Sequence, residues 1–254
     1  MNERVFFDNL IIAWFILAAV VCVVLLFVDA PYGRHIGTRR WGPTIGNRIG
    51  WMLMEWPAAI IFPLCLLFGR NVNLVTALVF VGLWEAHYLH RAYIYPLMLR
   101  GKHKRIPLIV VGLGFFFNVV EGYLNGRYIF AFSGGYPSNW LYDPRFLVGV
   151  ALFIAGFVVN RQSDEILRRL RQPGESGYRI PYGGMFQWVS CPNYLGEIVE
   201  WFGWALLTWS LPGLAFAVWT VANLAPRAWA HHRWYRENFP DYPQERQALV
   251  PGVW

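Results

Sequence analysis

The amino-acid sequence predicts an all-α, polytopic membrane protein with seven transmembrane helices, built as a single domain over residues 1–254. The first observation is composition: 56% of the residues are hydrophobic and 15% are charged, below the roughly 25% that soluble domains carry. The second is length, because six or seven apolar runs approach or exceed the ~20 residues that a helix needs to cross a bilayer. The third is the placement of basic residues.

Lysine and arginine gather in four clusters on alternate connections between the apolar runs: Arg34–Arg48, Arg100–Arg105, Arg161–Arg179 and Arg227–Arg246. Cytoplasmic loops of membrane proteins carry such an excess of basic residues. A seven-helix path with its N-terminus outside and its C-terminus in the cytosol puts all four clusters on the cytosolic side. The net charge of +7 therefore reflects topology, and a nucleic-acid partner is not expected because the charges form no continuous patch.

The apolar runs give the expected helices in order. The first run, Leu10–Val28, is too long for a signal-peptide core and lacks a clear cleavage site, so we expect a retained first helix. Proline and glycine mark the turns, including Leu211-Pro212-Gly213 before the last helix. We expect the tail from Asn238 to Trp254 to run along the surface. The expected helices cover residues 8–28, 47–68, 73–97, 106–131, 145–169, 194–209 and 212–236.

Familiar metal and nucleotide motifs are missing from the sequence. The pairs His87/His90 and His231/His232 resemble fragments of the histidine boxes of membrane di-iron enzymes, but no His-Glu-x-x-His motif occurs, and we expect no metal. The three cysteines have no disulfide or zinc spacing. No GxGxxG follows a strand and no P-loop occurs, so arginines and helix ends would have to hold a phosphate-bearing cofactor.

The stretch from Asn160 to Trp201 is the most polar part of this apolar chain. It runs from an arginine-rich helix end through a proline- and glycine-containing loop into a helix that carries Glu197 and Glu200. Carboxylates on a membrane-like helix usually face a partner or a wet cavity. The stretch predicts a binding site for a large, charged, hydrogen-bonding ligand. The alternative is positive-inside topology with arginines at lipid headgroups.

Two polar residues inside earlier apolar helices are candidates for catalysis. Burial disfavours the charged form of Glu55, so we expect a neutral carboxyl that can donate a hydrogen bond. Tyr88 lies three residues after Glu85, and a buried tyrosine near carboxyl groups suits donation of a proton or hydrogen bond to a substrate oxygen. A structural carboxyl bonded to a neighbouring helix is the alternative for Glu55.

Several motifs together resemble the membrane steroid 5α-reductases over essentially the whole chain. They are Tyr32-Gly33-Arg34-His35, Met54-Glu55-Trp56-Pro57, His87-Tyr88-Leu89-His90-Arg91, Gly177-Tyr178-Arg179-Ile180-Pro181, the run from Pro192 to Trp201, His231-His232-Arg233-Trp234-Tyr235 and Asp241-Tyr242-Pro243. The resemblance implies reduction of the C4–C5 double bond of Δ4-3-oxosteroids such as testosterone or progesterone to 5α-dihydrosteroids. NADPH would be the hydride donor.

Residue by residue, the resemblance implies that Glu55 and Tyr88 hold the C3 carbonyl. Two hydrogen-bond donors there would stabilise the negative charge that develops on the oxygen as hydride adds to the enone. The resemblance implies that the cofactor is bound by Tyr32, Arg91, Asn160, Asp164, Arg171, Tyr178, Arg179, Asn193, Glu197, His231 and Tyr235. The animal enzymes generally have Asn and Arg where this chain has Leu99 and Lys102, so the preference for NADPH over NADH is carried by the resemblance.

Two other functions are compatible with parts of the sequence. Isoprenylcysteine carboxyl methyltransferases share a Pro-x-Tyr-x-Gly entry into a helix and bind S-adenosylmethionine, but they usually have Arg-His where this chain has Ser190-Cys191. A non-catalytic sterol-binding membrane protein would need no pair such as Glu55 and Tyr88. For the reductase, we expect a steroid or other enone lipid to enter from the bilayer, with membrane lipid around the helices and no obligate protein partner.

The location follows from the same topology. An integral membrane protein is expected, in the endoplasmic reticulum of a eukaryote or the inner membrane of a bacterium. The cofactor site would face the cytosol.

Overall fold

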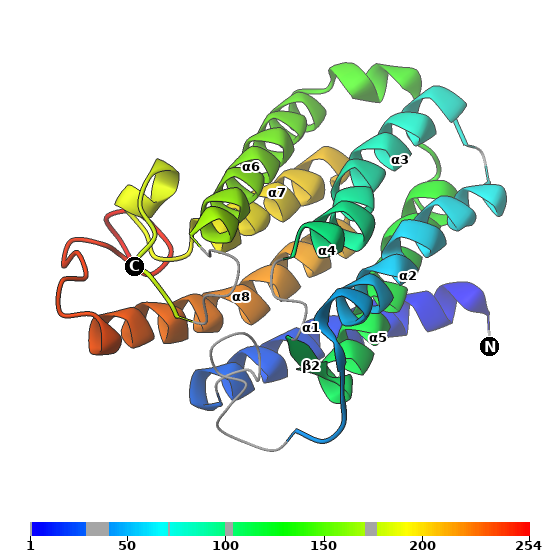
Figure 1. Cartoon of the computed structure of the whole chain (residues 1–254). Coiled ribbons are helices and arrows are strands. Elements are labelled where there is room, and N and C mark those ends of the chain that lie inside the picture. Colours follow the sequence, from blue (N-terminus) through cyan, green and yellow to red (C-terminus); the bar gives the residue numbers. More distant parts are fainter. Residues whose placement is uncertain (1, 29–40, 71, 100–103, 171–176) are drawn as a thin grey trace. The chain divides into compact units, whose positions relative to one another are not determined.

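The computed structural model describes residues 2–28, 41–70, 72–99, 104–170 and 177–254, and these are mostly helical (Figure 1). The longer helices are α1 Glu3–Phe27, α2 Asn47–Leu67, α3 Leu74–Leu89, α5 Leu108–Arg127, α6 Pro144–Arg169, α7 Pro192–Thr208 and α8 Leu211–Asn238. The shorter elements are β1 Thr44–Gly46, π-helix η2 His90–Ile94, α4 Tyr95–Met98, β2 Arg105–Pro107, π-helix η3 Tyr128–Phe132, and the 3₁₀-helices η4 Ser138–Tyr142 and η5 Gly184–Gln187.

The chain divides into two compact units. Unit 1 comprises Met1–Ile11 and Pro31–Phe146, and unit 2 comprises Ile12–Ala30 and Leu147–Trp254. Among the described residues, four helical stretches are long and apolar enough to cross a membrane: Glu3–Phe27, Asn47–Leu67, Leu108–Phe132 and Pro144–Arg169. The prediction of a mainly helical chain with apolar helices of membrane-spanning length is thus confirmed, whereas the count of seven spans, their orientation and the single-domain organisation stay predictions.

In unit 1, glycines bring α2 and α5 close together. A Cβ atom on Gly114 would lie 2.8 Å from the sulfur of Met54, and one on Gly126 would lie 2.8 Å from the Cβ of Cys65. Small residues let membrane helices approach closely and gain van der Waals contact. Both contacts advance in the same direction along α2 and α5, so the two helices run parallel.

A two-stranded antiparallel sheet joins the starts of these helices and corrects the purely helical expectation. Ile45 of β1 pairs with Ile106 of β2, and each strand leads directly into its helix. Ile106 is fully buried and packs with Trp51 and Met54. Strands this short leave no periodic pattern, which explains why sequence alone missed them.

Helix α3 runs antiparallel to α2 and is fixed by Trp84. The indole N–H of Trp84 donates to the carbonyl of Ala58 at 3.0 Å, and its ring stacks on Phe62 at 4.3 Å between centroids. The expected regular helix over 73–97 is interrupted after Leu89 by the π-helix η2. A π turn rotates the residues that follow it relative to a regular helix and frequently marks a functional site.

In unit 2, α6 and α7 cross at backbone contact through four glycines. A Cβ on Gly149 would lie 2.5 Å from the amide nitrogen of Leu207, and one on Gly196 would lie 2.5 Å from that of Asn160. Gly156 and Gly203 are equally enclosed by backbone atoms. Only glycine permits this close antiparallel approach, which determines how the other side chains of the two helices face one another.

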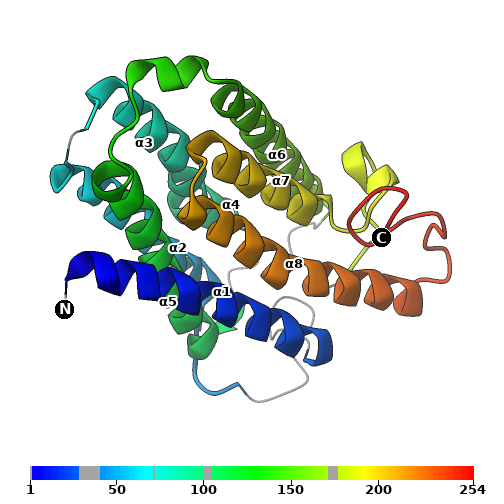
Figure 2. The same cartoon turned by 180° about the vertical axis from the view of Figure 1, so that it is seen from behind.

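Helices α7 and α8 form an antiparallel pair in unit 2 (Figure 2). Trp201 stacks on Phe216 at 3.9 Å between ring centroids. The tail after α8 corrects the expectation of a surface segment, because Tyr242 and Leu249 are 2% and 4% exposed. Leu249 packs among Cys191, Ile198 and other apolar residues of α7 and α8.

Candidate functional site

The predicted site residues fall in both units. Unit 1 carries Glu55, Tyr88 and Arg91, and unit 2 carries Asn160, Asp164, Tyr178, Arg179, Asn193, Glu197, His231 and Tyr235. Tyr32 and Arg171, and with them Lys102, lie outside the described residues. Each group is therefore considered within its own unit.

In unit 1, two elements bring polar side chains to Glu55 of α2. The guanidinium Nε of Arg91, on η2, lies 3.6 Å from Oε1 of Glu55. The side-chain amide of Asn118, on α5, donates to Oε2 of Glu55 at 3.3 Å and to the carbonyl of Met54 at 2.8 Å. Both carboxyl oxygens of Glu55 thus have N–H donors nearby. The neutral, hydrogen-bond-donating form of Glu55 stays a prediction.

Aromatic rings hold the Arg91 side chain in place. Its guanidinium lies 4.6 Å from the ring centre of Trp51 and 5.1 Å from that of Tyr95. Such cation–π contacts contribute about 0.5–2 kcal/mol, more where water is excluded. The side chains of Arg91 and Glu55 are only 16% and 12% exposed. Arg91, predicted as a cofactor ligand, is therefore also the charged partner of the predicted catalytic carboxyl.

Tyr88 lies in the aromatic core of unit 1. It is 2% exposed, and its ring contacts Trp84 and His87, each at 4.9 Å between centroids. Arg91 follows Tyr88 by three positions, and the π-helix begins between them at His90. The rigid setting of Tyr88 favours a fixed hydroxyl direction, as a catalytic donor requires.

In unit 2, the predicted cofactor residues on α6 and α7 form a hydrogen-bonded array. The amide of Asn160 donates to the carbonyl of Asn193 at 2.9 Å and to Oε2 of Glu197 at 3.4 Å. The amide of Asn193 donates to Oδ1 of Asp164 at 3.2 Å. Two amides and two carboxylates from facing helices are suited to a ligand rich in hydroxyl and amide groups, such as a dinucleotide.

The glycine crossing explains why this array forms. Gly156 lies one helical turn before Asn160, and Gly196 lies three residues after Asn193. Because the two backbones touch at these glycines, the short side chain of Asn160 can reach across to α7. The predicted ligand-binding stretch and the closest helix contact of unit 2 are thus one structure.

The predicted cofactor residues on α8 and on the loop before α7 have different surroundings. His231 Nε2 lies 3.2 Å from the hydroxyl of Tyr194, so this histidine joins the α7 group. Tyr235 is 3% exposed and stacks on Tyr242 at 5.2 Å, facing the tail. Tyr178 packs edge-on against Trp234 at 5.2 Å, and Arg179 is exposed.

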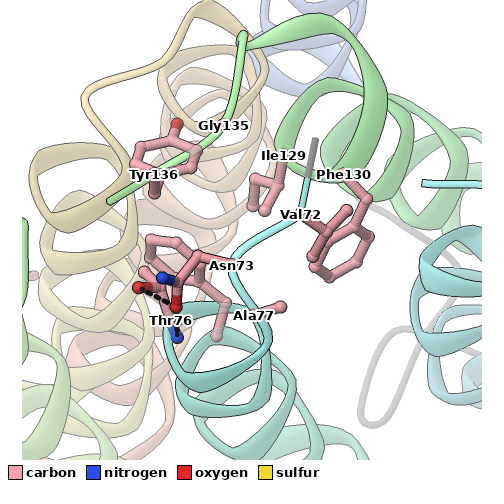
Figure 3. A pocket seen from close by; sticks show the side chains of 9 residues that line it. Val72, Asn73, Thr76, Ala77, Ile129, Phe130, Gly135 and Tyr136 are labelled. Atoms are coloured by element: carbon pink, nitrogen blue, oxygen red, sulfur yellow. Dashed lines mark hydrogen bonds between the residues drawn. The ribbon is translucent and has the colours of Figure 1, made fainter. Parts of the chain in front are cut away.

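A pocket in unit 1 lies elsewhere, at the other end of α3 (Figure 3). Its volume is only about 10 Å³, and Asn73, Phe80, Phe130 and Tyr136 are among its lining residues. Twelve residues of helix, roughly 18 Å, separate Thr76 in its wall from Tyr88. It is smaller than the 300–1,000 Å³ typical of ligand sites, so it is not assigned to the substrate.

Sequence reasoning missed some residues that shape the two groups. The sequence does not indicate that Asn118 contacts Glu55 or that Tyr194 contacts His231. The glycines of α6 and α7 offered a usable signal, because each helix carries two glycines seven residues apart. Within the described residues, no group of three or more His, Cys, Asp or Glu side chains could hold a metal ion.

Comparison with known proteins adds to this geometry. A family profile described as 3-oxo-5-alpha-steroid 4-dehydrogenase matches residues 104–254. The chain is 38% identical to steroid 5-alpha-reductase DET2 of Gossypium hirsutum over 261 residues, covering 100% of this chain and 99% of the relative. It is 42% identical to 3-oxo-5-alpha-steroid 4-dehydrogenase 1 of Bos taurus, covering 91% of each protein, and 43% identical to 3-oxo-5-alpha-steroid 4-dehydrogenase 2 of Sus scrofa, covering 93% of each.

Proposed function

Because the chain belongs to the 3-oxo-5-alpha-steroid 4-dehydrogenase family, we propose that it reduces the C4–C5 double bond of Δ4-3-oxosteroids to the 5α-dihydro products with NADPH. The family is one of oxidoreductases that act on CH–CH bonds. The observation that carries the proposal is similarity along the whole chain, from the helix of Glu55 to the C-terminal tail. Steroids resembling testosterone or progesterone are the expected substrates.

Unit 1 supplies the groups that act on the substrate carbonyl in this proposal. The hydroxyl of Tyr88 and the carboxyl of Glu55 donate hydrogen bonds to the C3 oxygen, where negative charge develops as hydride adds at C5. A donor aimed at such an oxygen in a water-poor site lowers the barrier by about 3–4 kcal/mol. The burial of both side chains supports this role. Arg91 and Asn118 fix the direction of the Glu55 carboxyl.

Unit 2 supplies most of the groups that hold the cofactor. NADPH, when bound, provides the hydride. The chemistry of the donor set supports a dinucleotide, since Asp164 and Glu197 can accept hydrogen bonds from ribose hydroxyls and Asn193 can both donate and accept. His231 adds a donor from α8. Tyr178, Arg179 and Tyr235, with Tyr32, Arg91 and Arg171, complete the proposed set.

The membrane topology in this proposal has seven transmembrane helices, an outer N-terminus and a cytosolic C-terminus. Four helical stretches with the length and apolar character to span support it. The apolar steroid enters from the bilayer, and the cofactor arrives from the cytosol. The host membrane would be the endoplasmic reticulum or a bacterial inner membrane.

The test is turnover by the purified, detergent-solubilised protein. NADPH oxidation is followed by absorbance with testosterone or progesterone, and the product is identified by mass and by the stereochemistry at C5. A 5α-dihydro product is the expected result. Cofactor binding without steroid reduction would indicate that the substrate is another enone lipid. Binding of S-adenosylmethionine instead would support the methyltransferase alternative.

A further inference from the structure

A buried hydrogen-bonded cluster in unit 2 lies beside the proposed cofactor residues without belonging to them. We propose that Ser190, His232 and Tyr242 form a clasp that positions Asn193 and His231, which makes the C-terminal tail part of the cofactor site. This inference rests on the proposed function. The three residues come from three segments: the loop before α7, the end of α8, and the tail.

The geometry of the clasp is compact. Ser190 Oγ lies 2.6 Å from Nδ1 of His232 and 2.6 Å from the hydroxyl oxygen of Tyr242. It also lies 3.1 Å from the backbone carbonyl of Gln247, in the tail. Ser190, His232 and Tyr242 are only 3%, 6% and 2% exposed. Buried polar groups at these distances must satisfy one another, because little water is available.

Counting donors and acceptors assigns the hydrogens. A serine hydroxyl donates one hydrogen bond and accepts two, whereas the carbonyl of Gln247 can only accept. All three contacts are satisfied when the hydroxyl of Ser190 donates to Gln247, while Tyr242 and Nδ1–H of His232 donate to Ser190. The clasp therefore requires a hydrogen on Nδ1 of His232. The opposite arrangement, with Ser190 donating to Nδ1, leaves the contact with Gln247 without a hydrogen.

Burial of the clasp also keeps its tyrosine neutral. Burial raises the pKa of Tyr242 above its usual range, and the neighbouring Ser190 and Arg246 side chains only partly offset this increase. The Arg246 guanidinium lies 5.1 Å from the ring centre of Tyr242. The phenol hydrogen needed for donation to Ser190 is thus retained at physiological pH.

Short connections link the clasp to the cofactor residues. Ser190 precedes Asn193 by three residues, and α7 begins between them at Pro192. His232 follows His231, whose Nε2 meets Tyr194 of α7. The tail completes the connection, because the backbone N–H groups of Ser190 and Cys191 donate to the carbonyls of Gln247 and Ala248 at 2.8 and 3.2 Å. The clasp thus fixes the start of α7 against the end of α8.

Three variants test the clasp by direct NADPH binding, measured by calorimetry, and by steady-state kinetics. Ser190→Ala leaves two buried donors without an acceptor, and we expect the Kd for NADPH to rise roughly tenfold to a hundredfold. Tyr242→Phe removes one hydrogen bond, so a rise of roughly threefold to tenfold is expected. The double variant should bind no more weakly than Ser190→Ala alone, because both changes break one network. In each, kcat at saturating cofactor should fall less than twofold.

The matched control is Tyr182→Phe. Tyr182 is 59% exposed, and its ring centre lies 5.1 Å from the Arg246 guanidinium. Loss of its hydroxyl should leave the Kd for NADPH unchanged. If Tyr182→Phe weakened binding as much as Tyr242→Phe, the effect would not be specific to the buried hydroxyl network and the clasp would be wrong.

Two further measurements separate positioning from simple stabilisation. His232→Asn keeps an N–H near the Nδ1 position and should recover most of the affinity that His232→Phe loses. The nitrogen-15 spectrum of wild-type His232 should show a hydrogen on Nδ1. The clasp is overturned if Nδ1 carries no hydrogen, or if the variants lower the melting temperature while NADPH binds as in the wild type. Failure of the wild type to bind NADPH at all would instead refute the proposed function, and the clasp with it.

Discussion

Units 1 and 2 hold their candidate functional groups in opposite ways. In unit 1, Glu55, Asn118 and Arg91 come from different elements and meet through side chains, with Trp51 and Tyr95 packed around the guanidinium. In unit 2, the hydrogen-bonded polar array lies on two helices, α6 and α7, whose backbones are in contact. Charge and aromatic packing dominate the first group, and close backbone approach dominates the second.

The contrast indicates how each group would fail. Side chains of unit 1 can be replaced with modest movement of the helices, so substitutions there should lower the catalytic rate rather than prevent folding. The helix crossing of unit 2 leaves no room for a methyl group, so substitution of its glycines should impair folding first.

The largest loss is expected for Gly156→Ala in unit 2. The new Cβ would lie 2.5 Å from the carbonyl oxygen of Gly196 and 2.8 Å from the Cα of Glu200. Backbone atoms cannot rotate away, so the helices must separate at a cost of about 3 kcal/mol or more. We expect little folded protein by size-exclusion chromatography and no activity.

Gly112→Ala in α5 is the control for this prediction. Nothing lies within 4 Å of the Cβ position of Gly112, and replacing a mid-helix glycine stabilises by about 0.5–1 kcal/mol. The yield of folded protein should therefore be unchanged or higher. Equal yields of Gly156→Ala and Gly112→Ala would show that the close crossing is not required.

In unit 1, Tyr88→Phe and Glu55→Gln should reduce turnover without loss of folding. Tyr88→Phe removes one proposed donor to the C3 oxygen, and kcat should fall about 10²–10³-fold while NADPH binding changes little. Glu55→Gln replaces the proposed carboxyl O–H donor by a weaker amide N–H donor, so its kcat should fall as well, but by less. Steady-state kinetics and calorimetric titration measure the two quantities. Tyr93→Phe is the control, since Tyr93 is 37% exposed and packs on Trp56. Full activity of either variant would remove that residue from the proposed carbonyl site.

A smaller effect is expected for Asn160→Ala in unit 2. The variant loses the 2.9 Å bond to the carbonyl of Asn193 and the contact with Glu197. Loss of such a hydrogen bond costs about 0.5–1.5 kcal/mol, so the Kd for NADPH should rise roughly twofold to tenfold. The control is Asn238→Ala, an exposed asparagine that also donates to a backbone carbonyl at 2.9 Å. Similar behaviour of the two variants would separate Asn160 from the cofactor.

Sequence alone predicted most helices because long apolar runs and turn residues are local signals. Contacts between distant residues were not predictable in the same way. Helix α1 begins at Glu3, several residues before the expected residue 8, and Glu3 pairs with Arg127 of α5 at 2.7 Å. A polar start looks like a flanking segment until its distant partner is known. The π-helix after Leu89 likewise has no distinctive residue pattern.

The candidate site shows the same division. Motif resemblance singled out Asn160 on α6 and Asn193 and Glu197 on α7, and the structure bonds them to one another. It did not reveal that Arg91 pairs with Glu55, because these residues lie on different helices and were assigned separate roles. The clasp at Ser190 was invisible for a similar reason. Its three side chains form no sequence motif, and they come together only because the tail packs back against α7 and α8.

The smallest effect is expected for a more exposed counterpart of the Glu55–Arg91 pair. Asp143 and Arg145 form an ion pair over a tryptophan, with 2.8 Å between the partners and 4.5 Å from the guanidinium to Trp140. Hydrogen bonds from Arg145 lower the pKa of Asp143 to about 2. Asp143→Asn should nevertheless change kcat less than twofold and the melting temperature by at most about 2 °C, because exposed pairs are screened by solvent.

The pH dependence of this variant follows from the direction of the pKa shift. A lowered pKa in the folded state means that the stabilising contribution of Asp143 is fully present above its ordinary value of 3.8 and is lost as pH falls towards 2. The melting-temperature difference between wild type and Asp143→Asn should thus be constant from pH 8 to 5 and shrink below pH 4. A loss of activity comparable to that of Glu55→Gln would mean that burial is not what distinguishes the two pairs. Any carboxylate–arginine pair over a tryptophan in unit 1 would then affect activity. The burial of Glu55 would no longer explain its role in catalysis.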